Sequence, residues 1–236
     1  MTSKIEYQIH CTCTTYYLFI ILSHNNYRAM EVTLNDLYCA NNYAIALEKN
    51  GDITGAKKYY LLAIERNEEP APFNYAILLH RENKLQEAKK YYLMYINLMD
   101  NKQKNPAALA LYNYAKILKG EGNIEEAKKY YLIGVKRNHT YSMHNLAIIL
   151  EDEGNIEEAK IYYLMAIKND YVESINNYAI LLNSKGNIKE AKKYLLMAIK
   201  KNHKRAANNY ASLLRAEGNI EDANKYSLMA YRFNSS

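Results

Sequence analysis

The sequence predicts an all-α solenoid of about six antiparallel helix pairs, and three observations support this prediction. First, the tripeptide Asn-Tyr-Ala, written once as Asn-Leu-Ala, recurs at steps of 32 residues with a single step of 39. Second, glycine or asparagine stands at fixed places in each repeat. Third, alanine recurs at two fixed places in all of them. A constant period of this size is typical of a stacked array, in which each repeat covers the apolar face of its neighbour.

The array covers residues 37–235, and residues 1–36 form an N-terminal extension. We number each repeat so that the alanine of Asn-Tyr-Ala is position 8. Residues 101–107 are an insertion that carries Asn105-Pro106, a dipeptide typical of a loop. The six repeats are then 37–68, 69–100, 108–139, 140–171, 172–203 and 204–235.

The extension contains an apolar run at residues 16–22 that allows three interpretations. The run is too short to span a bilayer, and no small-residue cleavage site of a secretory signal follows it. It resembles residues 162–167 of the array, so it could be the worn second helix of a degenerate repeat, or a cap. Met30 could also be the true start of the protein. The sequence leaves these alternatives open.

Each repeat is predicted to contain helix A at about positions 2–14 and helix B at about positions 17–30. Position 15 is glycine in five repeats and Asn83 in the second, and both residues end helices in the left-handed conformation. Position 16 is Asp or Asn in five repeats, as expected of an N-cap. Glutamates three residues later predict a capping box; they are Glu126, Glu158 and Glu190. Asparagine at position 31 closes helix B in four repeats.

Small residues are expected to set the packing between the two helices of a repeat. Alanine occupies positions 8 and 20 in all six repeats, which lets helices A and B approach closely. Leucine at position 11 and tyrosine or leucine at position 24 fill the flanks. In the last repeat Ser227 replaces the aromatic residue, and Asn224 and Lys225 keep the helix polar. We therefore expect this repeat to act as its own cap.

Together these positions resemble the pattern of the tetratricopeptide-repeat family. In the third repeat Gly122, Ala127, Tyr131 and Gly134 match it at positions 15, 20, 24 and 27. The resemblance implies a right-handed superhelix whose helices A line a concave groove. The chain departs from the family in a period about two residues shorter and in lacking the proline that usually opens the inter-repeat turn. The second repeat fits least well, with Pro72 at position 4 and Tyr95 at position 27.

The side of helix A that should face the groove carries positions 2, 6, 9 and 13, at about 100° per residue. Position 6 is asparagine in every repeat, although asparagine inside a helix costs up to about 0.7 kcal/mol relative to alanine. Its amide can pair bidentately with a peptide bond, and the row resembles the asparagine ladder of the O-linked N-acetylglucosamine transferases. Isoleucine at position 9 adds an apolar rail. The expected peptide-binding residues are Asn42, Asn74, Asn113, Asn145, Asn177, Asn209, Ile45, Ile77, Ile148 and Ile180.

A structural interpretation of the same row stands beside this one. Recently copied repeats share residues for no functional reason, and the asparagines could bond only to neighbouring helices or water. The paired lysines at positions 21 and 22 are interpreted as solvated ion pairs with acids three or four residues earlier in the same helix. The tyrosines at positions 23 and 24 are interpreted as packing residues.

The expected function is that of a non-enzymatic scaffold that binds an extended peptide or a partner protein in the groove. No phosphate-binding glycine loop, nucleophile elbow or paired metal motif is present, so we expect no catalysis, cofactor or metal. His10, Cys11 and Cys13 lie close together but lack the other half of a zinc site. Three cysteines favour a reducing compartment, and we expect a cytoplasmic monomer without membrane contact.

A single-stranded RNA-binding protein is the alternative function, because helix-pair arrays can read one base per repeat. That function needs a continuous basic track. The net charge of +6 is spread over both signs, and acids of the fourth and fifth repeats would repel phosphate; they are Glu151, Asp152 and Glu173. A third interpretation is a solenoid that works through its outer face and leaves the groove unused.

Overall fold

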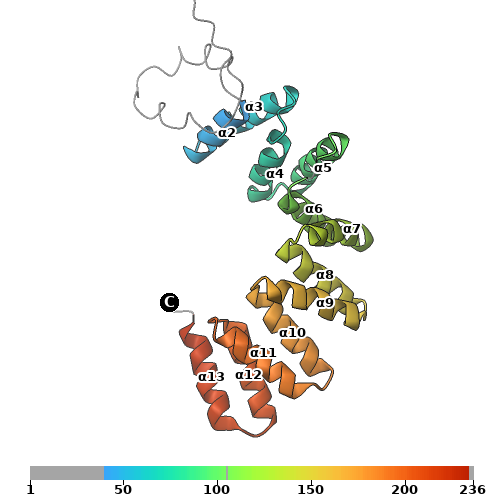
Figure 1. The fold of residues 1–236 in the computed structure, drawn as a ribbon. Coiled ribbons are helices and arrows are strands. Elements are labelled where there is room, and N and C mark those ends of the chain that lie inside the picture. Colours follow the sequence, from blue (N-terminus) through green and yellow to red (C-terminus); the bar gives the residue numbers. More distant parts are fainter. Residues whose placement is uncertain (1–39, 105, 234–236) are drawn as a thin grey trace, which may run out of the picture. The chain divides into compact units, whose positions relative to one another are not determined.

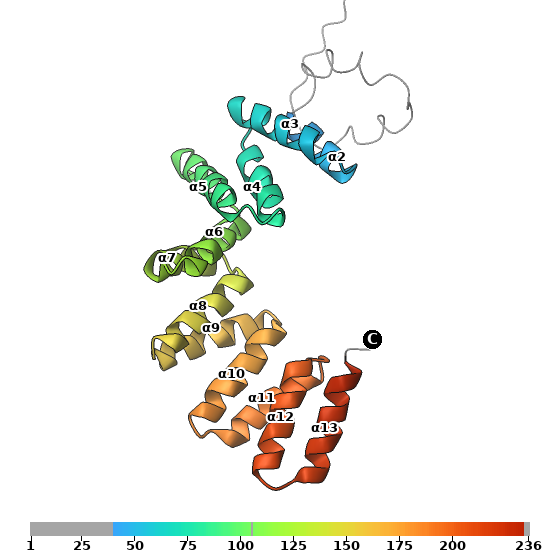
Figure 2. The ribbon, with the colours of Figure 1, turned by 180° about the vertical axis from the view of Figure 1, so that it is seen from behind.

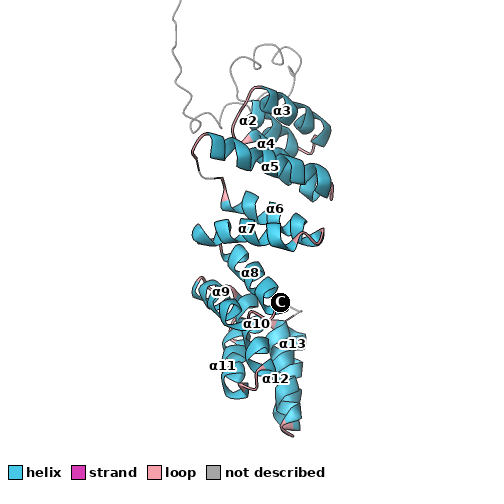
Figure 3. Cartoon of the chain, turned by 90° about the vertical axis from the view of Figure 1, so that its right-hand side faces the viewer, coloured by secondary structure: helices cyan, strands magenta, loops and turns pink. Residues whose placement is uncertain are grey.

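The computed structural model describes residues 40–104 and 106–233, and these contain twelve helices and no strand (Figures 1 and 3). The interpretations given for the extension, and for His10, Cys11 and Cys13, fall outside the described residues. None of the helices in these two stretches is long and apolar enough to cross a membrane. The chain divides into two compact units, residues 1–71 and residues 72–236.

The first unit contains one described helix pair, α2 (Ala40–Lys49) and α3 (Ile53–Glu65). The carboxylate of Glu68 accepts hydrogen bonds from the backbone N–H groups of Ala40 and Asn41, both at 2.9 Å. A carboxylate at this place satisfies two free donors of α2 and opposes the positive end of its helix dipole. Glu68 therefore fixes the start of α2.

The second unit contains five helix pairs, which Figure 2 shows from behind. Within this unit α5 to α13 each pack against the next helix along the chain, and α10 also contacts α12. The pairs are α4 (Ala71–Arg81) and α5 (Leu85–Asn101), α6 (Ala108–Gly120) and α7 (Ile124–Lys136), α8 (Thr140–Asp152) and α9 (Ile156–Lys168), α10 (Val172–Ser184) and α11 (Ile188–Ile199), and α12 (Lys204–Ala216) and α13 (Ile220–Arg232). This confirms the predicted all-α array of helix pairs, whereas the handedness of a superhelix stays a prediction.

The turns between helices A and B have the predicted left-handed residue at position 15. Gly122 has φ of 81° and Gly154 has φ of 80°, and Asn83 takes the same conformation at φ of 60°. The next N–H then reaches back to helix A, as that of Asn155 does to the carbonyl of Leu150 at 2.8 Å. This is the Schellman bond, and it satisfies a carbonyl at the helix end.

The N-caps of helix B follow the prediction only in part. Asp52 accepts from the Gly55 N–H at 2.8 Å, and Asn219 accepts from the Asp222 N–H at 3.2 Å. Asn123, Asn155 and Asn187 make no side-chain capping bond. The predicted capping box with Glu126, Glu158 and Glu190 is wrong, because it needs the backbone N–H at position 16. In these repeats that N–H already donates to the preceding leucine carbonyl.

The small residues lie where the two helices of a repeat touch. All twelve alanines at positions 8 and 20 are fully buried. Gly134 lies at the junction with the next repeat, where an added Cβ would stand 2.8 Å from the Cβ of Ser142. Edge-to-face tyrosine pairs join positions 7 and 23, as in Tyr178 and Tyr194 with ring centroids 4.9 Å apart. These contacts agree with the packing role expected for the tyrosines.

The loop at the predicted insertion 101–107 begins later than expected, because α5 continues to Asn101. Tyr95 stands at position 27, where the other repeats have alanine or glycine. Its ring stacks on Phe73 with centroids 5.2 Å apart, and its hydroxyl accepts from the Ala107 N–H at 3.3 Å. Pro72 lies in the first turn of α4, where a missing N–H costs no helical hydrogen bond. Tyr95, which departs from the repeat pattern, therefore contacts the longer connection that follows the second repeat.

Lysines at position 21 bridge consecutive repeats, in addition to the predicted pairs within one helix that Lys128 and Lys160 make with Glu125 and Glu157. Lys128 binds Glu153 at 2.8 Å, and Lys89 and Lys192 bind the acids at the same place, Glu121 and Glu217. The fifth repeat has Lys185 at that place. Because that place holds no acid, Lys160 of the fourth repeat binds Glu157 of its own helix instead, at 2.6 Å. These pairs are at the molecular surface, so we expect each to contribute at most about 1 kcal/mol.

Candidate binding face

We call the side of the A helices that carries positions 2, 6, 9 and 13 the ladder face, and we describe it within the second unit. Its asparagines at position 6 are all half-buried. The isoleucines at position 9 range from half-buried Ile77 and Ile148 to Ile180, which is 44% exposed. Asn42 and Ile45 lie on α2 of the first unit and are half-buried too. A ligand could therefore reach the predicted residues, each of which is also anchored in its helix.

Two of the ladder asparagines, Asn113 and Asn209, are hydrogen-bonded to the repeat before theirs. The Asn113 amide donates to the Tyr92 hydroxyl at 3.0 Å, and the Asn209 amide donates to the side-chain oxygen of Asn176 at 2.9 Å. The Asn145 amide donates to the backbone carbonyl of Tyr141 in its own helix at 2.9 Å, and Asn145 and Asn177 also lie beside the hydroxyls of Tyr112 and Tyr163 in the preceding repeats. The row therefore ties neighbouring repeats together. The structural interpretation of the asparagines accounts for these bonds.

The tyrosines at position 24 connect helix B to helix A of the same repeat through position 12. The Tyr60 hydroxyl donates to Glu48 at 2.8 Å, and the Tyr163 hydroxyl donates to Glu151 at 2.7 Å. Burial raises the pKa of Tyr60 to about 12 and that of Tyr163 well above its ordinary value. These hydroxyls therefore stay protonated and act as donors at every physiological pH.

Tyr131 differs from the other tyrosines at this position. It is fully buried, and its hydroxyl is the one buried side-chain polar atom without a hydrogen-bond partner among the residues that the structure describes. Position 12 of its repeat is Lys119. A lysine ammonium cannot accept a hydrogen bond from a hydroxyl, whereas the glutamates of the first and fourth repeats can. A buried hydroxyl without a partner costs stability.

We expect opposite effects when the two equivalent tyrosines lose their hydroxyls. Tyr131→Phe removes an unpaired polar group and should raise the free energy of unfolding by about 1 kcal/mol. Tyr163→Phe breaks the bonds with Glu151 and Asn177 and should lower it by about 0.5–1.5 kcal/mol. Urea unfolding followed by far-ultraviolet circular dichroism measures both. Equal destabilisation by the two variants would mean that the Tyr131 hydroxyl has a partner in solution.

Position 5 carries buried polar groups that the sequence analysis did not single out. His144 is 8% exposed, and its Nδ1 lies 2.8 Å from the Ser174 hydroxyl of the next repeat. Asn176 is the corresponding residue one repeat later and is 3% exposed. Asparagine or histidine precedes the ladder asparagine in four of the six repeats, which was visible in the sequence. That signal could have identified this second row.

Aromatic rings form a cluster at the start of the ladder face in the third and fourth repeats. Tyr141 stands at position 2 and is 47% exposed. Its ring lies 5.7 Å from that of Tyr112, 5.7 Å from that of His139 and 5.1 Å from that of Tyr171, centroid to centroid. This exposed ring lies four residues before Asn145, which is one helical turn away. The sequence analysis missed Tyr141, although it stands at a groove position.

Charges of both signs surround this cluster. Glu173, Lys119 and Arg205 all act on His144, whose pKa burial lowers to about 4. The pKa of His139 is also lowered by burial. His144 and His139 are therefore neutral at physiological pH, and the charged groups that act on His144 are one carboxylate and two cations. Among the described residues no group of three or more His, Cys, Asp or Glu side chains could hold a metal ion.

Comparison with known proteins agrees with this architecture. The tetratricopeptide repeat model matches residues 38–70, 108–137 and 140–171. None of the curated proteins compared with this chain matches it. Solved structures with the same fold include PilF of Pseudomonas aeruginosa, which is 18% identical, with a TM-score of 0.64 over 82% of this chain and 89% of that one.

Two further structures share the fold at similar identity. A tetratricopeptide repeat protein of Parabacteroides merdae is 19% identical, with a TM-score of 0.61 over 79% of this chain and 75% of that one. YrrB, described as a TPR protein with an unusual peptide-binding site, is 20% identical, with a TM-score of 0.56 over 75% of this chain and 93% of that one. Three of the helix pairs therefore match the tetratricopeptide repeat model, and the all-α array shares the fold of tetratricopeptide repeat proteins.

Proposed function

We propose that this protein is an interaction scaffold that holds an extended peptide, or an extended segment of a partner protein, along its ladder face. The repeat fold indicates a scaffold that binds proteins. The observation that supports the ladder face as the site is the pairing of half-buried amides with exposed apolar side chains. Asn177 and Ile180 are three residues apart on α10 and so adjoin on one helix surface. Amides would hold the ligand backbone, and the isoleucines would hold its side chains.

The hydrogen bonds between repeats are compatible with this proposal. An asparagine amide offers two N–H donors and a carbonyl oxygen with two lone pairs. The bond from Asn113 to Tyr92, or from Asn209 to Asn176, uses one of these donors. The same bond fixes the rotamer of the amide, so less conformational entropy is lost when a ligand binds. Absence of catalysis, cytoplasmic location and a monomeric state remain predictions from the sequence.

The ligand for this test is a peptide selected from a displayed random library. We expect Asn145→Ala combined with Asn177→Ala to weaken its binding by about 1–3 kcal/mol, because each lost hydrogen bond contributes on the order of 0.5–1.5 kcal/mol. From the sequence, stability should stay level or rise slightly. The side-chain bonds that Asn145 makes with the Tyr141 carbonyl and Asn177 with the Asn176 amide revise this expectation toward a loss of about 1–2 kcal/mol. Titration calorimetry and urea unfolding measure the two effects.

A second variant separates binding from stability. Ile180→Ser changes an exposed side chain on the ladder face and should weaken the same peptide about tenfold through lost apolar contact, with little effect on unfolding. Ile161→Ser is the matched control, because Ile161 is 55% exposed but lies on helix B. If both variants bind the peptide as the parent does, the ladder face is not the site.

A further inference from the structure

Positive charge is concentrated on and around α11. Residues 185–205 contain eight lysines and arginines and one acid, Glu190, which gives a local charge of +7. The whole chain carries +6, so all the other residues together carry −1. The basic character of the protein is therefore a property of this single segment.

Five lysines of this segment have no ion-pair or hydrogen-bond partner among the described residues, and three of the five line one part of the surface. These three are Lys189, Lys193 and Lys200, whereas Lys192 is paired with Glu217. The position of Lys189 is occupied by an acid in the two preceding B helices. There Glu125 and Glu157 each pair with the lysine three residues later. The exchange of an acid for Lys189 thus leaves α11 with positive charge that no neighbour neutralises.

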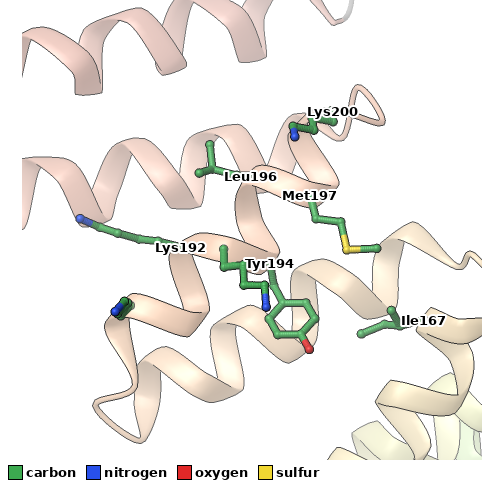
Figure 4. A pocket seen from close by; sticks show the side chains of 8 residues that line it. Ile167, Lys192, Tyr194, Leu196, Met197 and Lys200 are labelled. Atoms are coloured by element: carbon green, nitrogen blue, oxygen red, sulfur yellow. The ribbon is translucent and has the colours of Figure 1, made fainter.

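These lysines surround a shallow, open depression of about 720 Å³ on the outer surface of α11. Figure 4 shows its apolar lining, with Met197 extending from α11 toward Ile167 of α9. Leu196 and Tyr194 complete this lining. Met197 is 38% exposed. Lysine stems can lie along such a surface while their ammonium groups reach outward.

The lining offers almost no group that could recognise a peptide backbone or a base. Besides the lysines, its only polar side chain is Tyr194, and it contains no amide. A bound peptide could place its C=O groups near the lysines, but for its N–H groups the Tyr194 hydroxyl is the only side-chain acceptor in this lining. A second copy of the chain would bring the same charge and be repelled. A lipid surface needs anionic headgroups met by cations and an apolar boundary met by apolar side chains, and it needs no directional hydrogen bonds.

We propose that this outer surface of α11, the α11 face, docks on a membrane surface that contains anionic lipids. Lys189, Lys193 and Lys200 bind the headgroups, and Met197 enters the boundary with the acyl chains. The contact is peripheral and revises the expectation from sequence that the protein has no membrane contact. It is independent of the ladder face, so either proposal can fail without the other.

Co-sedimentation of the full chain with phosphatidylcholine vesicles, with and without phosphatidylserine, tests this proposal. The protein should pellet with the anionic vesicles and remain in solution with the neutral ones, and added salt should release it. The triple variant Lys189→Gln, Lys193→Gln, Lys200→Gln should bind the anionic vesicles at least about tenfold more weakly. The corresponding three Lys→Arg changes keep the charge and should retain binding.

A charge-matched control is Lys129→Gln, Lys136→Gln, Lys225→Gln, which removes three exposed lysines from helices B of other repeats and should bind the vesicles like the parent. Met197→Ser should weaken vesicle binding severalfold while the charge is unchanged. The proposal is overturned if anionic vesicles do not bind the protein, or if both triple glutamine variants bind them equally. It is also overturned if poly-glutamate or a single-stranded RNA, but not vesicles, distinguishes the α11 variant from the parent.

Discussion

Tyr163→Ala is expected to lower the free energy of unfolding by about 3–5 kcal/mol. Tyr163 is a fully buried residue of α9, and its ring contacts His144 of α8 and Tyr178 of α10. Truncation leaves a cavity between two repeats and removes the hydroxyl that binds Glu151 and Asn177. Because stability in an array is a sum over repeats and their interfaces, the loss should be concentrated at the junction of the fourth and fifth repeats.

Urea unfolding gives the total effect, and hydrogen exchange locates it in α8 to α10. Ile161→Ala is the control on the same helix, because its side chain is 55% exposed and its loss should change stability by no more than about 0.5 kcal/mol. Similar losses for the two variants would contradict a core role for Tyr163.

The pH dependence of stability should carry a contribution from His144 of up to about 3 kcal/mol. Burial lowers the pKa of His144 from 6.5 to about 4; Lys119 and Arg205 act in the same direction, and Glu173 opposes them. The unfolded chain therefore binds this proton more readily than the folded chain between these two values. The contribution is complete above pH 6.5 and is lost as the pH falls toward 4.

His144→Asn isolates this contribution, because asparagine is the residue at the same position of the next repeat, where Asn176 is 3% exposed. The stability difference between parent and variant should shrink as the pH falls through this window, since only the parent has a histidine to protonate there. Unfolding curves at a series of pH values measure it. A difference that stays constant with pH would show that His144 remains neutral in the unfolded chain, or charged in the folded one.

The helices could be predicted from sequence because their boundaries depend on local chemistry. Gly122 or Asn83 at position 15 ends a helix through its own backbone conformation. Buried alanines such as Ala127 mark the close approach of helices A and B, which recurs in every repeat. The capping boxes could not be predicted correctly. The N–H of Asn123 has two possible acceptors, the Glu126 side chain and the Leu118 carbonyl. It donates to the Leu118 carbonyl, which the left-handed turn brings within hydrogen-bond distance.

The candidate site was predicted less completely, because its contacts join different repeats. The sequence placed Asn113 and Asn209 on one side of helix A, but it could not show that one bonds to Tyr92 and the other to Asn176. It likewise paired Lys128 with acids of its own helix, whereas Glu153 of the next repeat lies closer than Glu125, at 2.8 Å against 3.4 Å. Partners across a junction depend on the stacking of repeats, which no single period determines.

The bridge between Lys89 and Glu121 has a consequence for engineering. Lys128 and Glu153 are 25 residues apart, as are Lys192 and Glu217, whereas Lys89 and Glu121 are 32 apart because seven residues are inserted between them. The bridge forms all the same, so added chain length at this junction leaves the contact between repeats intact. The stretch between Asn101 and Ala108 is therefore the natural place to graft a fluorescent tag or an affinity epitope into the interior of the array.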